Sequence, residues 1–469
     1  MPSILGANSV SGDLITNSLC FNDGDSARLA RAQANGNQDK WTWSGWVKRS
    51  TLGAAQCFFA TTDGSATSFD AKFDGSDNLD VYNYLGGGFG ARLITNRVFR
   101  DVAAWYHIVI VYDSGNGTEA NRLRIYVNGT EETSFSTTNY PSQNEDSDLN
   151  VSGSDIEIGR QANGSQFFDG YMAEMFLLDG QAKAPTDFGE TDSNGVWVPK
   201  EYTGGSFGTN GFHLQFKQTG TSANAAGIGA DTSGNGNHFA VSNLAAIDVG
   251  IDTPFNNFAT LDPTNNFASP AVSEGNLEFD SNSSSGCSMV STIAPSNGKW
   301  YAEAKIAPAA SAGAVVAVAA GVSEVGKESF NVKGQGASRP NVGYNYGDNI
   351  NTNVEIDGSL VDTESQYRAG DIVGIALNLD DGEVTFYLNG TAINSGTAYN
   401  LHTNSTHEST GFSVQTHTGG GNQIVSYNFG NPAFAISSGN SDANGYGNFE
   451  YSVPSGYFAL CTKNLAEYG

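Results

Sequence analysis

Short segments in which apolar and polar residues alternate run along almost the whole chain, and turns rich in Gly, Asn, Asp and Ser separate them. Most of these segments keep a period of two, whereas few windows keep the i, i+3, i+4, i+7 spacing of an amphipathic helix. Glycine alone supplies 58 of the 469 residues, as expected of a chain with many tight turns. The pattern predicts an all-β protein.

A first group of strands is predicted between residues 41 and 180. Its best-defined member is the segment RLRIYVNG, in which Leu123, Ile125 and Val127 face one way and the dipeptide Asn128-Gly129 is a strong hairpin signal. One face of this strand is therefore expected in the core and the other in water. The predicted strands of the group cover residues 41–49, 105–113, 122–132, 155–160 and 169–180.

The segment WTWSGWVKR carries tryptophan on both of its faces. Strict alternation places Trp41, Trp43 and Val47 together and leaves Trp46 on the opposite face, unless a bulge at Gly45 reverses the sense. A tryptophan on the second face predicts that another part of the chain covers it.

A second group of strands repeats this style toward the C-terminus. The segment 371–393 spells out a hairpin, in which apolar residues alternate on both sides of the turn Asp380-Asp381-Gly382. Its end, FYLNGT, closely matches IYVNGT of the first group, so both groups are expected to contain the same strand and turn. The predicted strands of this group cover residues 299–308, 371–393 and 424–434.

These groups predict two antiparallel jelly-roll β-sandwiches of related architecture. Strand candidates also occur at 211–216 and 238–244, and the phenylalanines around them need burial, so the stretch between the sandwiches is expected to be structured. The predicted division is an N-terminal docking arm at 1–14, a first sandwich at 15–185, a structured connector at 186–264, and a second sandwich with a C-terminal extension at 265–469.

The charge of the chain limits the kinds of partner that it is expected to bind. There are 22 Lys and Arg against 49 Asp and Glu, a formal net charge of −27, with the acidic residues spread over the chain and no basic stripe. Such a surface repels a phosphate backbone, so no nucleic-acid partner is expected. The longest weakly polar stretch, 307–322, is interrupted by Pro308 and Gly313 and is too short for a membrane span, so membrane insertion is not expected.

The N-terminal residues lack the basic and apolar regions of a signal peptide, so the chain is expected to be made and folded in a cytosol. The cysteines have no CxxC spacing and are interpreted as small buried thiols, with their redox state left open. They are Cys20, Cys57, Cys287 and Cys461.

Residues from about 15 to 185 resemble the laminin-G-like, concanavalin A-like family through SGWVKR, WYHIVIVYD, LRIYVNG and IGR…FFDGYMAEM, which occur in the order that the family uses. Residues from about 265 to 434 resemble a SPRY domain through GKWYAEAKI, GDIVGIALNLDDGEVTFYLNG and YNFGNPAF. The two domains with an intervening DTSGNGN are similar to structural proteins of marine tailed bacteriophages.

This resemblance implies a virion protein, assembled in the host cytoplasm, that displays lectin-like modules. A tail fibre or appendage for attachment to a host-surface glycan or protein is the first expectation, with other virion proteins as partners. A homo-oligomer is implied, with a trimer favoured because trimers are common among phage appendages. No heptad or β-helical shaft is visible in the sequence, so a capsid decoration or head fibre is the alternative, and a purely architectural subunit is a third.

The sequence does not predict an enzyme. Glycoside hydrolases of this fold carry E-x-D-x-E on one strand, which sets an acid and a nucleophile on a sugar. The nearest match is EGNLEFD, with Glu274, Glu278 and Asp280 on one face, and it lacks the middle carboxylate, so a polysaccharide depolymerase is a minor alternative. The six histidines form no HExxH motif, and His107 is interpreted as a hydrogen-bonded packing residue within a strand.

Two pairs of tyrosines are candidates for ligand binding. Tyr82 and Tyr84, and likewise Tyr344 and Tyr346, are two residues apart and therefore on the same side of a strand. Such rings can stack on a sugar while a neighbouring carboxylate, such as that of Asp348, meets its hydroxyls. The alternative is that the tyrosines fill an outer sheet face as cross-strand neighbours.

Calcium is the one candidate cofactor. Asp231, Asn235 and Asn237 alternate oxygen-bearing side chains along one loop, and hard cations take six to eight oxygens from loops of this kind. Some laminin-G-like domains hold Ca²⁺, which the resemblance adds to this interpretation. Asx-rich turns that satisfy their own backbone explain the same residues equally well.

Overall fold

The described residues of the computed structural model form two compact units, of which the first ends at Phe255 and the second begins at Asn256. Both units consist almost entirely of β-strands, which confirms the predicted all-β class. The structure describes residues 15–62, 67–161, 163–281, 287–307, 318–324, 341–346, 352–356, 359–364, 367–401, 410–416 and 423–469.

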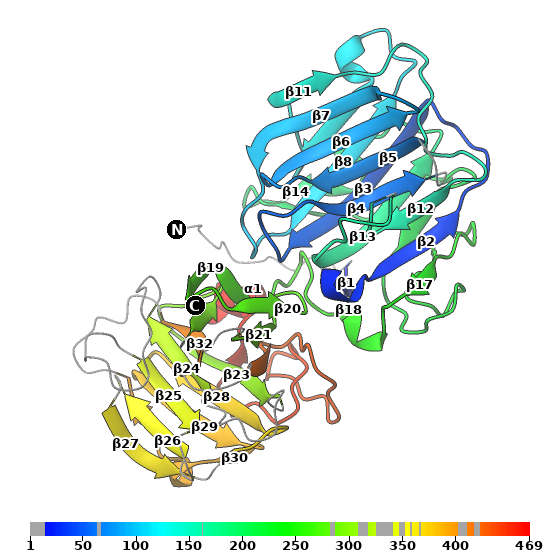
Figure 1. Ribbon diagram of the computed structural model, residues 1–469. Helices are drawn as coiled ribbons and strands as arrows, with labels where there is room; N and C mark the ends of the chain where they lie inside the picture. Colours follow the sequence, from blue (N-terminus) through cyan, green and yellow to red (C-terminus); the bar gives the residue numbers. More distant parts are fainter. Residues whose placement is uncertain are drawn as a thin grey trace. The chain divides into compact units, whose positions relative to one another are not determined.

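The first unit is a sandwich of two antiparallel sheets (Figure 1). The first of them, sheet A, has the strand order β10-β9-β8-β3-β13-β1-β18, and β16 also pairs with β13. Its strands are β1 (Ser18–Phe21), β3 (Lys40–Arg49), β8 (Tyr106–Asp113), β9 (Leu123–Val127), β10 (Thr130–Glu131), β13 (Gly170–Asp179), β16 (Phe212–Leu214) and β18 (Val249–Gly250).

The facing sheet, sheet B, has the order β11-β7-β6-β5-β4-β12-β2-β17. A separate hairpin joins β14 (Gly189–Thr191) to β15 (Trp197–Pro199). The strands of sheet B are β2 (Arg28–Ala32), β4 (Gln56–Thr62), β5 (Thr67–Phe73), β6 (Asn78–Leu85), β7 (Phe89–Val98), β11 (Phe135–Asn139), β12 (Asp155–Ile158) and β17 (Ala240–Ser242).

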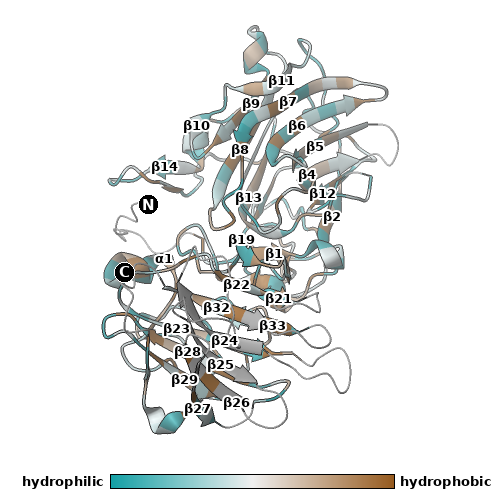
Figure 2. Cartoon of the chain, turned by 60° about the vertical axis from the view of Figure 1, so that its left-hand side comes forward, coloured by the Kyte–Doolittle hydropathy of each residue, from teal (hydrophilic) through white to brown (hydrophobic). Residues whose placement is uncertain are grey.

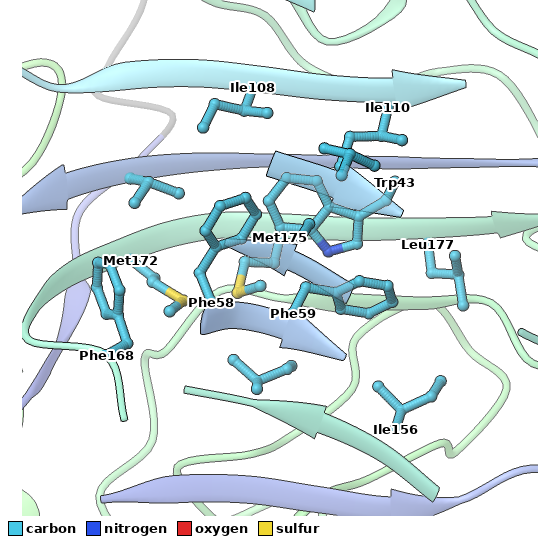
Figure 3. Packing of buried hydrophobic residues seen from close by; sticks show 14 of the residues in the cluster. Trp43, Phe58, Phe59, Ile108, Ile110, Ile156, Phe168, Met172, Met175 and Leu177 are labelled. Carbon is cyan, nitrogen blue, oxygen red and sulfur yellow. The ribbon is translucent and has the colours of Figure 1, made fainter. Parts of the chain in front are cut away.

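The core of this sandwich is aromatic. Trp43 of β3 lies 5.3 Å from the ring of Phe58 and 5.6 Å from that of Phe59, both on β4, so the two sheets meet through tilted ring contacts. Figure 3 shows these rings packed with Met172 and Met175 of β13. All five side chains are fully buried. The neighbours Phe58 and Phe59 both reach the core because the register of β4 shifts at this point, and a second shift in β13 lets Met172 and Met175 do the same.

The second unit is a second sandwich. Sheet C has the order β30-β29-β28-β23-β33-β21-β20, with β31 on β29 and β34 on β23, and sheet D has the order β27-β26-β25-β24-β32-β22-β19. The strands of sheet C are β20 (Ala271–Ser273), β21 (Glu278–Asp280), β23 (Lys299–Ile306), β28 (Ile372–Asn378), β29 (Glu383–Leu388), β30 (Thr391–Ala392), β31 (Tyr399–Asn400), β33 (Ile424–Asn428) and β34 (Phe458–Ala459). Those of sheet D are β19 (Leu261–Phe267), β22 (Ser288–Ser291), β24 (Val318–Glu324), β25 (Asn341–Tyr346), β26 (Thr352–Ile356), β27 (Ser359–Glu364) and β32 (Thr410–Thr416).

The two sandwiches share one strand order over six strands of each sheet. The order β10-β9-β8-β3-β13-β1 of sheet A matches β30-β29-β28-β23-β33-β21 of sheet C, and β7-β6-β5-β4-β12-β2 of sheet B matches β27-β26-β25-β24-β32-β22 of sheet D. The next strand differs, because β18 and β17 come late in the first unit whereas β20 and β19 come at the start of the second; β11 is an additional edge strand in the first unit. The prediction of two versions of one architecture is confirmed.

The matching hairpins are closed by the same device. Asn128 donates its backbone N–H to the carbonyl of His107 and accepts the N–H of His107 on its side-chain oxygen. Asn389 does the same with Ile372, at 2.9 and 3.0 Å. Each asparagine side chain thus extends the ladder by one hydrogen bond while its own backbone turns away at φ of +48° or +49°.

The glycine after each asparagine is covered by an aromatic ring. A Cβ added to Gly129 would lie 2.4 Å from the ring of Trp197, and one added to Gly390 would lie 2.5 Å from the ring of Tyr451. Both glycines also have φ near +78°, which favours glycine over other residues. In each unit, a segment that follows the sandwich therefore returns to pack on the hairpin turn.

Residues 186–255, named here the first strap, were expected to be part of a connector, and in the structure they lie within the first unit. They supply β16, β17 and β18 to its sheets. Trp197 and Phe255 of the strap pack on the cluster that contains Trp46, which is only 4% exposed. The predicted cover over the second face of β3 is thus confirmed, and the first strap is what provides it.

A buried ion pair fixes the end of the first strap. Nζ of Lys48 lies 2.8 Å from Oδ2 of Asp252, and both side chains are 1% exposed. Nε1 of Trp105 donates to the other oxygen of Asp252 at 3.2 Å, and the Lys48 ammonium lies 5.5 Å from the ring centre of Tyr171. A pair so deeply buried holds its geometry because either charge alone would be strongly destabilising.

Residues 429–457, named here the second strap, are held on sheet C by Glu303. This fully buried carboxylate accepts the backbone N–H groups of Glu450 and Tyr451 at 2.9 and 2.8 Å, and the amide of Asn428 at 3.2 Å. Burial raises the pKa of Glu303. The second strap is therefore bound through its backbone, where the first is bound through an ion pair and aromatic rings.

The described residues contain one α-helix, α1 (Thr462–Tyr468). No helix among them is long and apolar enough to cross a membrane. All four cysteines are buried, as predicted, and none of them forms a disulfide.

We predict that Asp252→Ala destabilises the first unit by about 3–5 kcal/mol, because it leaves the Lys48 ammonium buried without its counter-charge. Urea unfolding of the full chain followed by tryptophan fluorescence measures this, since five of the six tryptophans lie in the first unit. The exposed Glu190→Ala is the control and should change the free energy of unfolding by less than about 0.5 kcal/mol. Equal midpoints for the two variants would contradict the assigned role of the pair.

Candidate functional site

The outer face of sheet B carries the candidate site. Leu79 and Val81 of β6 point into the core. The residues that alternate with them, Asp80, Tyr82 and Tyr84, therefore lie on the opposite face. Figure 2 shows the alternation of hydrophilic and hydrophobic residues along the strands of this sheet. The outer face is thus lined by polar and aromatic side chains.

The register of the strands arranges these side chains in a row. Reading across sheet B from β12 to β7, each residue is paired with the next. Because directly opposed residues share a face, five side chains from five strands lie beside one another. They are those of Glu157, Ala60, Asp70, Tyr82 and Arg92.

Tyr82 lies at the centre of the site and is only 7% exposed. Its hydroxyl accepts a 2.7 Å hydrogen bond from the amide of Gln161, which belongs to the loop after β12. The Lys72 ammonium lies 5.3 Å and the Arg92 guanidinium 5.7 Å from its ring centre. Burial raises the pKa of Tyr82. Its ring is therefore covered and is not available to stack on a ligand.

The accessible rings beside it are those of Tyr84 and Phe89. Phe89 is 43% exposed and lies across the hairpin that joins β6 to β7. Its ring is edge-on to those of Tyr82 and Tyr84, with ring centres 5.3 and 5.4 Å away. Of the predicted tyrosine pair, Tyr84 is thus partly accessible and Tyr82 is not. Phe89 was not among the predicted site residues, although its place directly after the glycines at 86–88 was a usable signal; in the structure it pairs with Tyr84.

Arg92 is fixed in a bidentate ion pair. Its Nε and Nη2 donate to the two oxygens of Asp80 at 3.0 and 2.8 Å, and this hydrogen bonding raises the pKa of Arg92. The side chain of Asp80 is 1% exposed and that of Arg92 is 28% exposed. The guanidinium also lies 4.5 Å from the ring centre of Phe89. The pair presents one rigid cationic edge next to an exposed ring.

Lys72, Tyr82, Tyr84, Phe89 and Arg92 are named here the aromatic strip. The ammonium of Lys72 donates to the side-chain oxygen of Gln166 at 3.1 Å. A surface that combines half-exposed rings with fixed donors can stack on the apolar face of a sugar and bind its oxygens. The chemistry available here is reversible binding.

The second predicted pair lies on β25. The structure describes the backbone of Tyr344 and Tyr346 and not their side chains, and Asp348 lies outside the described residues. By strand order, β25 corresponds to β5 of the first sandwich, whereas Tyr82 and Tyr84 lie on β6. The two tyrosine pairs therefore occupy different positions in the shared architecture.

The residues predicted to bind calcium hold the first strap together. The carboxylate of Asp231 accepts the backbone N–H groups of His213 and Asn237 as well as both the N–H and the hydroxyl of Ser233. The amides of Asn235 and Asn237 donate to backbone carbonyls between Gly208 and Gly211. These bonds account for the side chains as an Asx-rich turn, and calcium binding stays a prediction.

Among the described residues, no group of three or more His, Cys, Asp or Glu side chains is placed to hold a metal ion. The expected alignment of Glu274, Glu278 and Asp280 on one strand face is wrong. Strand β21 begins only at Glu278, because Glu274 has a φ of +52° within the turn that precedes it. The sequence pattern had been extended across a turn.

A serine and a histidine do meet in sheet A. Nε2 of His107 lies 2.9 Å from the hydroxyl of Ser44, and Nδ1 lies 3.0 Å from Nε1 of Trp197. An indole N–H can only donate, so Nδ1 accepts and Nε2 carries the proton that is donated to Ser44. A general base must instead accept the proton of its serine. This buried pair is therefore a structural hydrogen bond, as predicted for His107.

Residues 21–184 match the concanavalin A-like lectin/glucanases superfamily, of the laminin G type, which supports the predicted first domain. No curated protein matches the chain.

Similar solved structures include the SPRY domain of human HERC1, at 15% identity over 36% of this chain and 96% of that one, with a TM-score of 0.30. Domains LG4-5 of the mouse laminin α1 chain are 9% identical over 97% of this chain and 91% of that one, with a TM-score of 0.29. A putative carbohydrate binding protein from Bacteroides ovatus is 14% identical over 50% of this chain and 59% of that one, with a TM-score of 0.31.

We predict that His107 makes the first unit sensitive to acid. Burial lowers the pKa of His107 from 6.5 to about 3, so between these pH values the unfolded chain binds a proton at His107 and the folded chain does not. The free energy of unfolding is therefore unaffected by His107 above about pH 6.5 and decreases by about 1.4 kcal/mol per pH unit as the pH falls from there toward 3.

The measurement is the free energy of unfolding of the full chain between pH 7 and 4. His107→Gln, which keeps one donor and one acceptor, should show a shallower pH slope than the unsubstituted chain, by about one proton. Parallel slopes would show that His107 is not the group responsible.

Proposed function

We propose that this protein is a non-enzymatic carbohydrate-binding component of a bacteriophage virion and that the aromatic strip binds a glycan of the host surface. The observation that carries the proposal is the 43% exposed ring of Phe89, set beside Tyr84 and the fixed Arg92 within a domain that matches a lectin superfamily. An exposed aromatic ring next to a rigid polar group is the usual composition of a sugar subsite.

Rigidity supports this assignment. The strip lies on three adjacent strands, and the hydrogen bonds to Asp80 and Gln161 hold Arg92 and Tyr82 in place before any ligand arrives. A preorganised surface loses little conformational entropy on binding. Each contact is weak alone, and many copies on one particle raise the overall affinity through avidity.

The carboxylates of the outer face support a binding role over a hydrolytic one. Asp80 is tied to Arg92, and Glu157 contacts the guanidinium groups of Arg160 and Arg28. Glycoside hydrolysis needs one carboxyl group that can donate a proton and a second that is free to attack or to activate water. Carboxylates that are already paired with arginine are poorly suited to both tasks.

The placement on a tail fibre or appendage rests on the resemblance of the combined domains to structural proteins of tailed phages. In this proposal other virion proteins hold the chain, the residues at 1–14 dock it, and the protein is a homo-oligomer, with a trimer favoured. A capsid decoration or head fibre would present the same strip and is the alternative location.

We predict that Phe89→Ala weakens glycan binding about tenfold, because a stacked aromatic ring contributes roughly 0.5–1.5 kcal/mol beyond its buried area. Isothermal titration of the full chain against host-surface polysaccharide measures this loss. The matched control is Val98→Ala, which removes a side chain that is 44% exposed on the same strand, and it should bind normally.

The same titration samples test the absence of hydrolysis. Polysaccharide recovered after prolonged incubation should show no new reducing ends. New reducing ends would reassign the protein to the depolymerases, and unchanged binding by Phe89→Ala would remove the strip as the site.

We predict that labelled antibody against this protein marks the tails of intact phage particles in electron micrographs. Label over the head would replace the tail fibre with the capsid alternative. Particles and host lysate that both lack the protein would contradict a virion role altogether.

A further inference from the structure

We infer that the saccharide bound by the aromatic strip is acidic and carries a carboxylate or a sulfate ester; this inference rests on the proposed function and specifies its ligand. The two cations of the strip keep donors that the protein does not use. The chain has 22 basic residues against 49 acidic ones, and two of the basic side chains lie beside this aromatic cluster.

The first unused donor belongs to Arg92. Asp80 takes Nε and Nη2, whereas Nη1 makes no hydrogen bond within the described part of the chain. The guanidinium lies 4.5 Å from the ring centre of Phe89 and is 28% exposed. Because the guanidinium covers one face of Phe89, a pyranose would pack on the opposite face or the rim of this ring. Its substituents would there lie near a guanidinium, which is the protein group that best recognises carboxylate and sulfate oxygens.

The second unused donor capacity belongs to Lys72. Its ammonium has three N–H groups and one hydrogen-bond partner in the described residues, the side-chain oxygen of Gln166. It lies 5.3 Å from the ring centre of Tyr82, and the Arg92 guanidinium lies 5.7 Å from the same centre. Both cationic groups thus lie beside the same buried ring.

The neighbouring acids are bonded within the protein. Asp80 is paired with Arg92, Asp70 is fully buried and accepts the hydroxyl of Ser68 at 2.6 Å, and Asp74 accepts backbone N–H groups of its own turn. The side chains of Asp80 and Asp70 do not project into solvent beside Phe89. An anion that reaches the strip therefore meets a guanidinium and an ammonium, while the net charge of −27 of the whole chain disfavours non-specific binding of polyanions.

The test is isothermal titration of the full chain with three probes of equal length: an oligouronate, a sulfated galactan oligosaccharide and a neutral β-glucan oligosaccharide. The expected result is that at least one acidic probe binds at least tenfold more tightly than the neutral one and weakens when the salt concentration is raised. Comparison of the first two probes distinguishes carboxylate from sulfate.

Two substitutions sharpen the test. Lys72→Gln should weaken binding of the acidic probe at least tenfold more than binding of the neutral probe. Lys305→Gln is the matched control in the other unit, where the ammonium of Lys305 likewise lies over a ring, 5.0 Å from the centre of Phe434, and it should change neither.

The outcomes separate the two proposals. Equal binding of acidic and neutral probes, with no effect of Lys72→Gln, overturns the acidic ligand and leaves glycan binding by the strip standing. If neither the three probes nor host polysaccharide binds, both the acidic ligand and glycan binding by the strip are overturned.

Discussion

The cover over the outer face of sheet A is the constraint on which the rest of the first unit depends. Strand β3 points Trp43 into the sandwich and Trp46 and Lys48 out of it, and both of the outward residues are buried. A tryptophan and an ammonium on one outer face need apolar contact and a counter-charge at the same time. The first strap supplies both within a few residues, because Asp252 and Phe255 lie near its end.

That constraint separates stability from the proposed recognition within the first unit. Sheet A is enclosed between sheet B and the first strap, so its histidine, serine and lysine serve the fold. Sheet B packs its apolar face against the same core and carries the aromatic strip on the other. A binding surface on rigid strands can change its side chains without disturbing the covered sheet, provided that Asp80 and Arg92 change together. The second unit shares the order of six strands in each sheet and secures its own strap through Glu303.

Much of the fold was readable from local pattern. Alternation located β3, β8, β9 and β28 and assigned Trp43 and Trp46 to opposite faces, because the period of two depends only on the backbone of the strand itself. The repeated Asn-Gly predicted both hairpins for the same local reason. The candidate site was only half predicted. Tyr82 and Tyr84 share a face as expected, but Gln161 and two cations enclose Tyr82, and these neighbours come from other strands and loops.

The sequence by itself therefore determined the strand periodicity, the hairpin turns, the relatedness of the two sandwiches and the need for a cover over Trp46, since each is written within one segment or in the likeness of two. Only the tertiary structure decided that the first strap provides the cover, that Asp252 neutralises Lys48 across 204 residues, and that Phe89 rather than Tyr82 is the exposed ring. Burial and pairing are properties of neighbours in space, and pattern along the chain does not specify which distant segment will occupy a given face.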